Sequence, residues 1–392
     1  MSQHDMNLEN QAGAAFRADL NEALKALVSD SSGPTAPNVT YPSQTWVDTS
    51  SNPVQVVRRR NLDNTAWTTI GRMDSQGWTA YEADRFYKSD GKRTAWYSPA
   101  PTELETASEL LIAVGDSIVK INQGTPIELP TLLSGTDYVI YALANGALEA
   151  VDADSSAPTN ARKVGGFHAR ASDGNINTNS CWDLNFRPRS NPRGMALSLD
   201  GQTWVDIYLC DVSYSLRGYS KNLETIADID NPLLVPARYG GNGVDIYSSG
   251  SWWSFNDVFS ASDKRMPYYN EFVAYAAGTV QFQSTGVDPV ITKHQPGHTS
   301  SCGIEQATGV MWQWGADITG SNATGAADWQ NWTEGRGDVF TNTLTAPLFG
   351  GEWASGVHSG SRASGWFQRP EQEGVQIGAR AVCGHINLQG GW

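Results

Sequence analysis

The stretch from Phe349 to Cys383 constrains the fold most, because it follows neither of the regular hydrophobic periods of secondary structure. Its paired glycines, Gly350 and Gly351, stand just before Trp353 and predict a tight backbone turn that leads into a buried ring. The positions between these fixed points share no chemistry. A rigid frame that carries unrelated side chains is typical of a binding face, and an ordinary irregular surface loop is the alternative.

We predict two sets of side chains in and before this stretch. The first set holds the backbone, with its tryptophans mostly buried: Trp312, Trp314, Trp353, Arg362, Trp366, Ile377 and Arg380. The second set points outward and contacts a ligand: Glu352, Ala354, Ser355, His358, Gly365, Phe367, Gln368, Gln372, Gly374, Gln376 and Ala381. Phe367 is the expected anchor, since aromatic residues dominate interface hot spots.

Ordered motifs over most of the chain accompany this stretch. They are ARKVGGFH (161–168), WDLNFRP (182–188), PRGM (192–195), DIYL (206–209), KRMPYYNEF (264–272), MWQWG (311–315), GRG (335–337), GGEW (350–353), SGSR (359–362) and IGAR (377–380). Together they resemble the C-type lectin fold of the formylglycine-generating-enzyme type. The likeness is closest to phage tropism determinants, the variable receptor-binding proteins of diversity-generating retroelements. The resemblance implies a homotrimer that binds a bacterial surface receptor, protein or glycan.

Composition narrows the class of partner. The chain has 392 residues with a formal charge of −14, which argues against a surface that follows nucleic-acid phosphates. The sequence contains no run of about 18 apolar residues, so no membrane span is predicted. The polar start, MSQHDMNLENQ, predicts no secretory signal, so we expect synthesis in the host cytoplasm and export within a virion. The widely spaced cysteines are expected to be buried thiols with at most one bridge: Cys181, Cys210, Cys302 and Cys383.

The first 75 residues predict a helix followed by strands. Apolar residues between Gly13 and Val28 form one stripe, in which Phe16, Leu20, Ala23 and Leu27 follow coiled-coil spacing. Strands are expected at Thr45–Thr49 and Val54–Gly71. This order resembles the N-terminal modules of phage tail fibres, which implies contact with tail or baseplate proteins. We therefore expect residues 1–75 to attach the chain to the virion.

The rest of the chain is predicted to be divided into three parts. Residues 76–106 are expected to be a connecting region. Residues 107–165 are expected to form a small β-sandwich with a hairpin at Asn145-Gly146, and residues 166–392 the C-type lectin domain. The last part is irregular and rich in Trp. One helix is expected in it, with Pro267 in its first turn and Gly278 as its stop. The predicted fold class is α+β.

Signals of enzyme or metal chemistry are weak. His294 and His298 have metal-ligand spacing for a helix, but Pro296 and Gly297 between them disfavour one. The pairs Asp152/Asp154 and Asp228/Asp230 are expected to lie in solvated turns. The tripeptide Arg336-Gly337-Asp338 overlaps the GRG motif and is interpreted as accidental.

The family resemblance suggests two further activities, and the sequence can be checked for the residues that each requires. Formylglycine-generating enzymes carry reactive cysteines between the corresponding motifs, whereas Gly351 to Arg380 contains none. Calcium-dependent sugar-binding lectins carry Glu-Pro-Asn or Gln-Pro-Asp, and Gln295-Pro296-Gly297 lacks the last carboxylate. We expect no catalytic residue, no metal and no cofactor.

The function expected is therefore a phage tail-fibre receptor-binding protein at the fibre tip, and not an enzyme. The alternatives are a structural fibre protein that binds nothing, or an enzyme of the same fold. Retroelement diversification is a separate hypothesis. It acts mostly on AAC codons, which cannot become the Glu or Gln codons found at Glu352, Gln368, Gln372 and Gln376 without a change in the third base.

Overall fold

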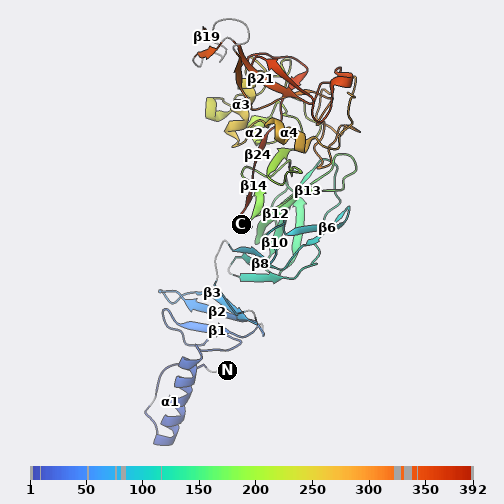
Figure 1. The fold of residues 1–392 in the computed structure, drawn as a ribbon. Helices are drawn as coiled ribbons and strands as arrows, with labels where there is room; N and C mark the ends of the chain where they lie inside the picture. The colour runs from blue at the N-terminus through green and yellow to red at the C-terminus, as the bar shows by residue number, and fades with distance from the viewer. Residues whose placement is uncertain are drawn as a thin grey trace.

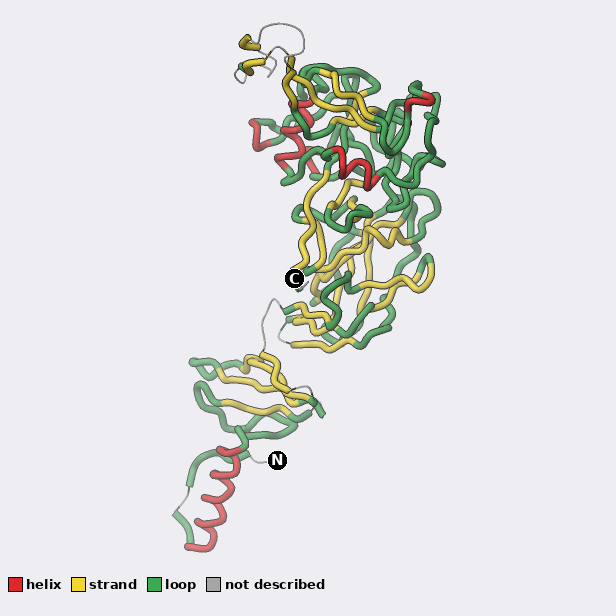
Figure 2. The backbone as a smooth tube through the Cα atoms, viewed as in Figure 1, coloured by secondary structure: helices red, strands yellow, loops and turns green. Residues whose placement is uncertain are grey.

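The computed structural model describes residues 3–8, 10–50, 53–75, 77–80, 85–115, 117–321, 328–330, 338–341 and 343–389. The chain is elongated: helix α1 lies at one end, a small sheet follows, and a larger body of strands and helices forms the other end (Figure 1). The C-terminal strand runs back from this body, so that the chain ends beside the middle strands. Strands and loops dominate, and helices are short apart from α1 (Figure 2). This confirms the α+β class.

The helix and strands predicted for the N-terminal part form, and the sheet extends beyond the predicted Gly71. Helix α1 spans Gly13–Val28, and Ala26 is its one buried residue. A four-stranded antiparallel sheet follows in the order β1 (Thr45–Asp48), β2 (Gln55–Arg60), β3 (Trp67–Asp74) and β4 (Gly77–Ala80). Most apolar side chains of α1 are exposed within one chain, with Leu27 at 66%. The folding of a single chain therefore does not explain the helical stripe.

Strands from the predicted connecting region contribute to the middle of the molecule. Strand β5 (Phe86–Lys88) pairs with β8 (Leu110–Val114), which pairs with β9 (Ser117–Ile121), and β6 (Trp96–Ala100) pairs with β7 (Glu103–Thr106). A second sheet has the order β11 (Leu148–Asp152), β10 (Asp137–Leu143), β12 (Ala161–Ala169) and β13 (Ile176–Asp183). One core contains residues from all these strands.

Two details of the predicted layout therefore change. Residues 86–106 include the three strands β5, β6 and β7, with Phe86, Trp96 and Leu104 buried, rather than a plain connection. Their short length and Pro99 obscured the strand pattern. The boundary expected at 165/166 falls within β12. The Asn145-Gly146 hairpin is confirmed, since Gly146 adopts a φ of +87° between β10 and β11.

The described residues of the C-terminal body form two larger sheets and a hairpin. The first has the order β14 (Phe186–Pro188), β24 (Val382–Asn387), β16 (Thr203–Asp206) and β15 (Met195–Leu197). In the second, β21 (Thr343–Phe349) pairs with β17 (Trp312–Trp314), β18 (Thr319–Ser321) and β22 (Ser364–Gln368), and β17 also pairs with β23 (Ile377–Gly378). A separate hairpin joins β19 (Asp328–Gln330) to β20 (Val339–Thr341).

The helices of this body are short: α2 (Tyr214–Arg217), α3 (Trp252–Ala261), α4 (Tyr269–Tyr275), and the 3-10 turns η1 (Ala237–Tyr239) and η2 (Gly356–His358). Helix α4 is the predicted one, but Pro267 precedes its cap, Tyr268, instead of lying in its first turn. Helix α3 was missed, although its buried Trp252, Phe255 and Phe259 follow helical spacing.

All four cysteines are buried and none is bridged, which confirms the prediction of buried thiols. Burial raises the pKa of Cys181 to about 12. Within the described ranges, we find no helix that is both long and apolar enough for a membrane span.

Candidate ligand-binding face

The C-terminal sheet supports the segment between β21 and β24. Its register aligns Gly378, Gln313, Phe349 and Ser364 across β23, β17, β21 and β22. Neighbouring strands are about 4.8 Å apart, so β23 and β22 lie roughly 14 Å apart at the two edges. The loops between β21 and β24 leave and re-enter this sheet, which fixes where they can lie.

The glycine turn forms as predicted. Gly350 and Gly351 have φ of +94° and +85°, a region that favours glycine. A Cβ atom on Gly351 would lie 2.3 Å from Ser359 Oγ, so a larger residue would displace the facing loop. Trp353, two residues on, packs beside Leu209, Ile226 and Met311, but it remains half-buried.

Arg380 is the strongest part of the support. Its side chain is fully buried, and burial lowers its pKa. Its guanidinium donates hydrogen bonds to the following acceptors: the carbonyls of Asp206 (2.7 Å), Ile207 (2.7 Å), Glu305 (2.6 Å) and Gln306 (3.3 Å), and Gln313 Oε1 (3.1 Å). One side chain thus joins β16, the 305–306 loop and β17.

The other predicted supports differ among themselves. Trp314 is fully buried and Ile377 is buried, as expected. Trp312 is half-buried, as is Trp353, whereas Trp366 is 43% exposed and so is less buried than predicted. Arg362, for which no burial was predicted, is exposed. The Trp366 ring still contacts the rings of Phe349 and Tyr269, at centroid distances of 6.1 and 5.8 Å. It covers the core from outside because β22 is an edge strand.

The structure places the predicted contact residues in three exposure groups. The exposed ones are Ala354, His358, Phe367, Gln372 and Gln376. The half-buried ones are Glu352, Ser355, Gly365, Gln368 and Gly374. Ala381 is completely buried, and its carbonyl accepts a hydrogen bond from the Asp206 N–H, so its assignment to the face was wrong. It lies beside β24 and belongs to the support.

Glu352 stabilises its own loop. Its Oε2 accepts the Ala354 N–H at 2.5 Å, and its Oε1 accepts the Ser355 hydroxyl at 2.9 Å. Ser355 Oγ in turn accepts the Glu352 N–H at 3.2 Å. The spacing Glu-x-x-Ser before η2 is the sequence signal for this turn. Both residues therefore shape the loop more than they offer free groups to a ligand.

The contact positions are supported in four places. The loop with Ala354 and His358 rests on residues 284–286, where the Gly286 N–H donates to the Trp353 carbonyl at 2.7 Å. Phe367 and Gln368 lie on β22. The loop with Gln372 is held against α3, because the Pro370 carbonyl accepts the Trp252 N–H at 2.9 Å. Gln376 directly precedes β23 and binds Trp312 through its carbonyl.

Sequence reasoning missed two exposed side chains in this region. Val357 in η2 is 65% exposed, and Trp366, next in sequence to Phe367, is 43% exposed. Residues of a strand alternate between faces, so Trp366 and Phe367 point to opposite sides of β22. Alternation within SGWFQ was the available signal for Phe367; nothing in the sequence marked Val357.

The two histidines considered as metal ligands instead form hydrogen bonds with protein groups. His298 is buried and donates from Nδ1 to the Thr308 carbonyl at 2.7 Å, while His294 Nδ1 lies 3.1 Å from both Glu305 oxygens. A turn at Pro296-Gly297 separates the two. In the described residues, no cluster of His, Cys, Asp or Glu could hold a metal ion. The GRG motif and residues 336–337 of the Arg-Gly-Asp tripeptide lie outside the described residues.

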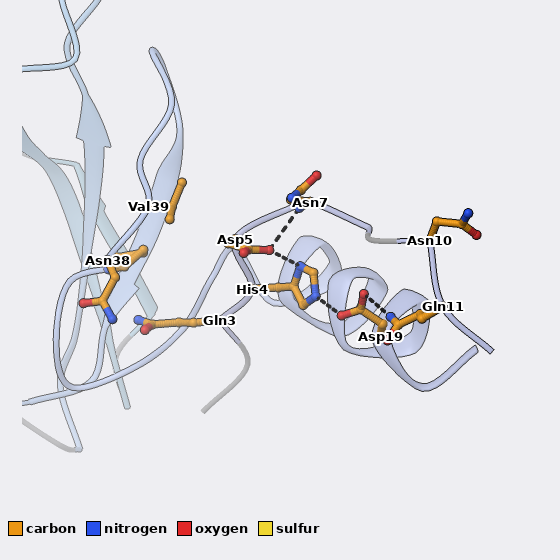
Figure 3. A pocket seen from close by; sticks show the side chains of 10 residues that line it. Gln3, His4, Asp5, Asn7, Asn10, Gln11, Asp19, Asn38 and Val39 are labelled. Atoms are coloured by element: carbon orange, nitrogen blue, oxygen red, sulfur yellow. Dashed lines mark hydrogen bonds and ion pairs between the residues drawn. The ribbon is translucent and has the colours of Figure 1, made fainter. Parts of the chain in front are cut away.

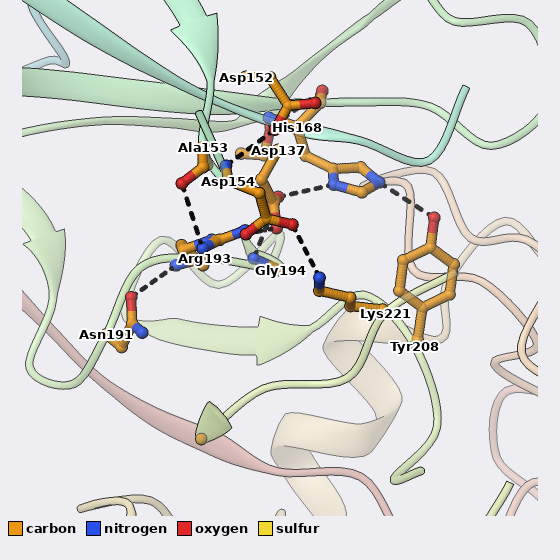
Figure 4. Close-up of polar contacts among 12 residues, drawn as sticks. Asp137, Asp152, Ala153, Asp154, His168, Asn191, Arg193, Gly194, Tyr208 and Lys221 are labelled. Carbon is orange, nitrogen blue, oxygen red and sulfur yellow. Dashed lines mark hydrogen bonds and ion pairs between the residues drawn. The ribbon is translucent and has the colours of Figure 1, made fainter. Parts of the chain in front are cut away.

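A polar cluster connects the middle strands to the C-terminal body (Figure 4). Asp154 Oδ1 and Oδ2 accept from Arg193 and Lys221, each at 2.8 Å, and these two hydrogen bonds lower the pKa of Asp154. His168 lies between Asp137 and Tyr208, at 2.8 and 3.1 Å. Asp154 lies in an exposed turn, as expected, and it also pairs with two cations from the other part of the chain.

A second polar hollow, of about 720 Å³, lies at the N-terminal segment beside α1 (Figure 3). His4 Nε2 lies 2.8 Å from Asp19 Oδ1, and Gln11 donates to Asp19 Oδ2 at 2.8 Å. These contacts hold the residues before α1 against the helix. This hollow is remote from the C-terminal sheet.

Comparison with known proteins defines the class of protein. No family model matches the chain. The tail fiber receptor-binding protein of Bordetella phage BPP-1 is 38% identical over 330 residues, which is 78% of this chain and 85% of that protein. A mixed fold with a C-terminal C-type lectin domain and this degree of identity define a phage tail-fibre receptor-binding protein.

Solved structures narrow the class to one family. The U1 and M1 variants of the Major Tropism Determinant each match with a TM-score of 0.74 and 34% identity, over 89% of this chain and 96% of theirs. The I1 variant matches equally well at 33% identity. The chain therefore belongs to the tropism-determinant family of tail-fibre receptor-binding proteins.

Proposed function

We propose that this chain is the part of a phage tail fibre that attaches to a bacterial surface receptor, and that the outward positions between Glu352 and Gln376 contact it. The observation that carries the proposal is the contrast within one segment. Arg380 and the Gly350-Gly351 turn fix its ends, while the side chains of Phe367, exposed at 73%, and His358 face solvent. Such positions can change without loss of folding.

The remaining parts of the chain suit this role. Residues 1–75 attach to tail or baseplate proteins, the middle strands separate them from the binding end, and the chain assembles as a homotrimer. Several copies per virion let weak single contacts sum to a useful avidity. The location is the virion tail, with the C-terminal body at the fibre tip. We propose binding rather than catalysis, since Gly351 to Arg380 contains no Cys and family relatives are named as receptor-binding proteins.

Diversification by a retroelement is compatible with this segment but rests on the family likeness alone. The genomic neighbourhood tests it. A reverse-transcriptase gene and a near-copy of the 3′ end of this gene would support diversification. A neighbourhood without both would mean that the present Gln and Glu codons are fixed.

Cell adsorption tests the site. Phe367→Ala and His358→Ala should reduce binding of the purified chain to susceptible cells. The free energy of unfolding should change by no more than about 0.5 kcal/mol, as is typical of surface substitutions. Leu199→Ala is the matched control, because Leu199 is 57% exposed on a distant turn. Loss of binding together with loss of stability would mean that the residues are structural.

A combined substitution separates the alternatives. Replacing Glu352, Ala354, His358, Phe367, Gln368, Gln372 and Gln376 together should abolish adsorption. Normal adsorption of that variant would place the receptor site elsewhere, and residues 240–251 before α3 are the next candidate. A wild-type chain that binds no cells at all would favour a purely structural fibre protein.

A further inference from the structure

Phe282 has an unusual backbone and an unusual exposure. Its φ is +60°, and its side chain is 72% exposed. A bulky residue in this left-handed region costs on the order of 1–3 kcal/mol, and such positions persist only where the surroundings impose them. Because the ring is exposed, its burial contributes almost no free energy to offset this backbone strain. The stability of the fold therefore explains neither the conformation nor the choice of Phe.

Hydrogen bonds to the candidate binding segment impose this conformation. The Phe282 N–H donates to the Ser359 carbonyl at 2.8 Å, one residue after η2. Gln281 Oε1 accepts the Ser361 N–H at 3.1 Å. A Cβ atom on Gly360 would lie 2.5 Å from Gln281 Oε1, so the two loops are in close contact. Phe282 is thus fixed relative to η2 although it lies far from it in sequence.

Ser284 forms a second attachment to the segment, at the residues before and at the start of η2. Ser284 Oγ donates to the Trp353 carbonyl at 2.7 Å and accepts the Gly356 N–H at 2.9 Å. Residues 281–284 therefore contact the segment both before and after Val357 and His358. Val357, 65% exposed, and Phe282, 72% exposed, lie on two loops that these hydrogen bonds hold together, and residues 281–284 lie outside the segment.

We propose that Phe282, together with Val357, is a permanent apolar contact for the receptor, and that the receptor surface it meets is protein. This inference rests on the proposed function. Interface hot spots are enriched in large aromatic side chains, and interface centres are depleted in charge. Val357 has no ring face on which a sugar could stack, and a glycan's hydroxyls would find no polar partner on either side chain. Apolar side chains of a protein fit both residues.

Two groups of residues then contribute differently to receptor binding. The positions around His358 and Phe367 can set which receptor is bound, while Phe282 adds apolar contact that does not depend on them. A residue kept in a strained conformation for binding is expected to cost stability. Substitution should therefore separate stability from binding in opposite directions.

The test compares Phe282→Asn with Leu223→Asn. Leu223 is a matched control: its φ is +63°, its side chain is 67% exposed, and its N–H donates to the Thr292 carbonyl at 2.7 Å, away from the segment. Asn tolerates the left-handed region, so both full-length variants should melt at or above the wild-type temperature. Only Phe282→Asn should weaken binding to intact bacterial cells that the wild type binds, by roughly tenfold in Kd.

Treatment of the cells distinguishes the receptor classes. Protease treatment should remove wild-type binding, and periodate oxidation of glycans should leave it. Equal binding by Phe282→Asn and wild type would overturn the inference, as would an equal loss in Leu223→Asn. Binding lost to periodate and kept after protease would overturn the protein receptor. If the wild-type chain bound no strain in a broad panel, the proposed function itself would fall, and this inference with it.

Discussion

Lys88 Nζ lies 2.8 Å from Asp183 Oδ2, and both side chains are completely excluded from solvent. Lys88 ends β5, and Asp183 ends β13, so the ion pair joins two strands separated by 95 residues of sequence. Asp183 also accepts the N–H groups of Ala95, Asn185 and Phe186 at 2.7 to 2.9 Å. The carboxylate therefore organises the meeting point of several segments.

Removing one partner of this pair should be strongly destabilising. Lys88→Met leaves a buried carboxylate without its cation, and such a change typically costs about 3–5 kcal/mol. Urea unfolding should show this loss. Lys120→Met is the control, since its pair with Glu109 is partly exposed and should contribute less than about 1 kcal/mol. Equal midpoints for the two variants would contradict the importance of the buried pair.

Arg380 should be irreplaceable even by lysine. Lysine has three donors on one atom and cannot reach the carbonyls of both β16 and the 305–306 loop, which would leave buried acceptors without partners. We expect Arg380→Lys to lower the free energy of unfolding by roughly 2–4 kcal/mol. Arg362→Lys, at an exposed position, should be nearly neutral. Denaturant titration of both variants decides the point.

Asp211 should make stability depend on pH. Burial raises its pKa to about 6, despite the hydrogen bond from Arg217 at 2.6 Å. The folded chain then holds a proton that the unfolded chain releases between about pH 4 and pH 6, so this group's contribution falls as pH rises through that window. The change is on the order of 3 kcal/mol. Asp211→Asn should remove this part of the pH profile; an unchanged profile would mean that Asp211 stays ionised.

Helix α1 should strengthen a trimer. Light scattering of the full chain should give about three times 42.5 kDa. Leu20→Glu combined with Leu27→Glu places charge on the stripe, and dissociation should then begin at higher protein concentration. Ala18→Glu, on the opposite side of the coiled-coil spacing, should have no effect. A wild-type chain that remains monomeric would contradict both the trimer and the role of α1.

Local signals were enough to predict some elements. The bounds of α1 follow from its period and from the proline-rich break after it, and the hairpin at Gly146 follows from the Asn-Gly pair. Both depend on interactions within a few residues. Strands β5, β6 and β7 were not predicted, because each is short and becomes a strand through partners elsewhere in the core.

The candidate site shows the same limit. Exposure of Phe367 could be predicted from the alternation in SGWFQ, whereas the burial of Arg380 depends on carbonyls more than 70 residues away. Ala381 was misplaced because loop positions have no period that separates inside from outside. Phe282 could not be found from the sequence, since its contact with Ser359 and its positive φ exist only in the folded chain.

The position of β24 in the first C-terminal sheet has a consequence for synthesis. It pairs with both β14 and β16, and Val382 faces Val205 across the sheet. A ribosome that adds about 5–20 residues per second leaves the edge of β16 waiting roughly 10–35 s for its partner. Unpaired edges invite association with other chains. Nascent copies crowded on one messenger would therefore be prone to aggregate until β24 has been made, and chaperones that shield strand edges would raise the yield of assembled fibres.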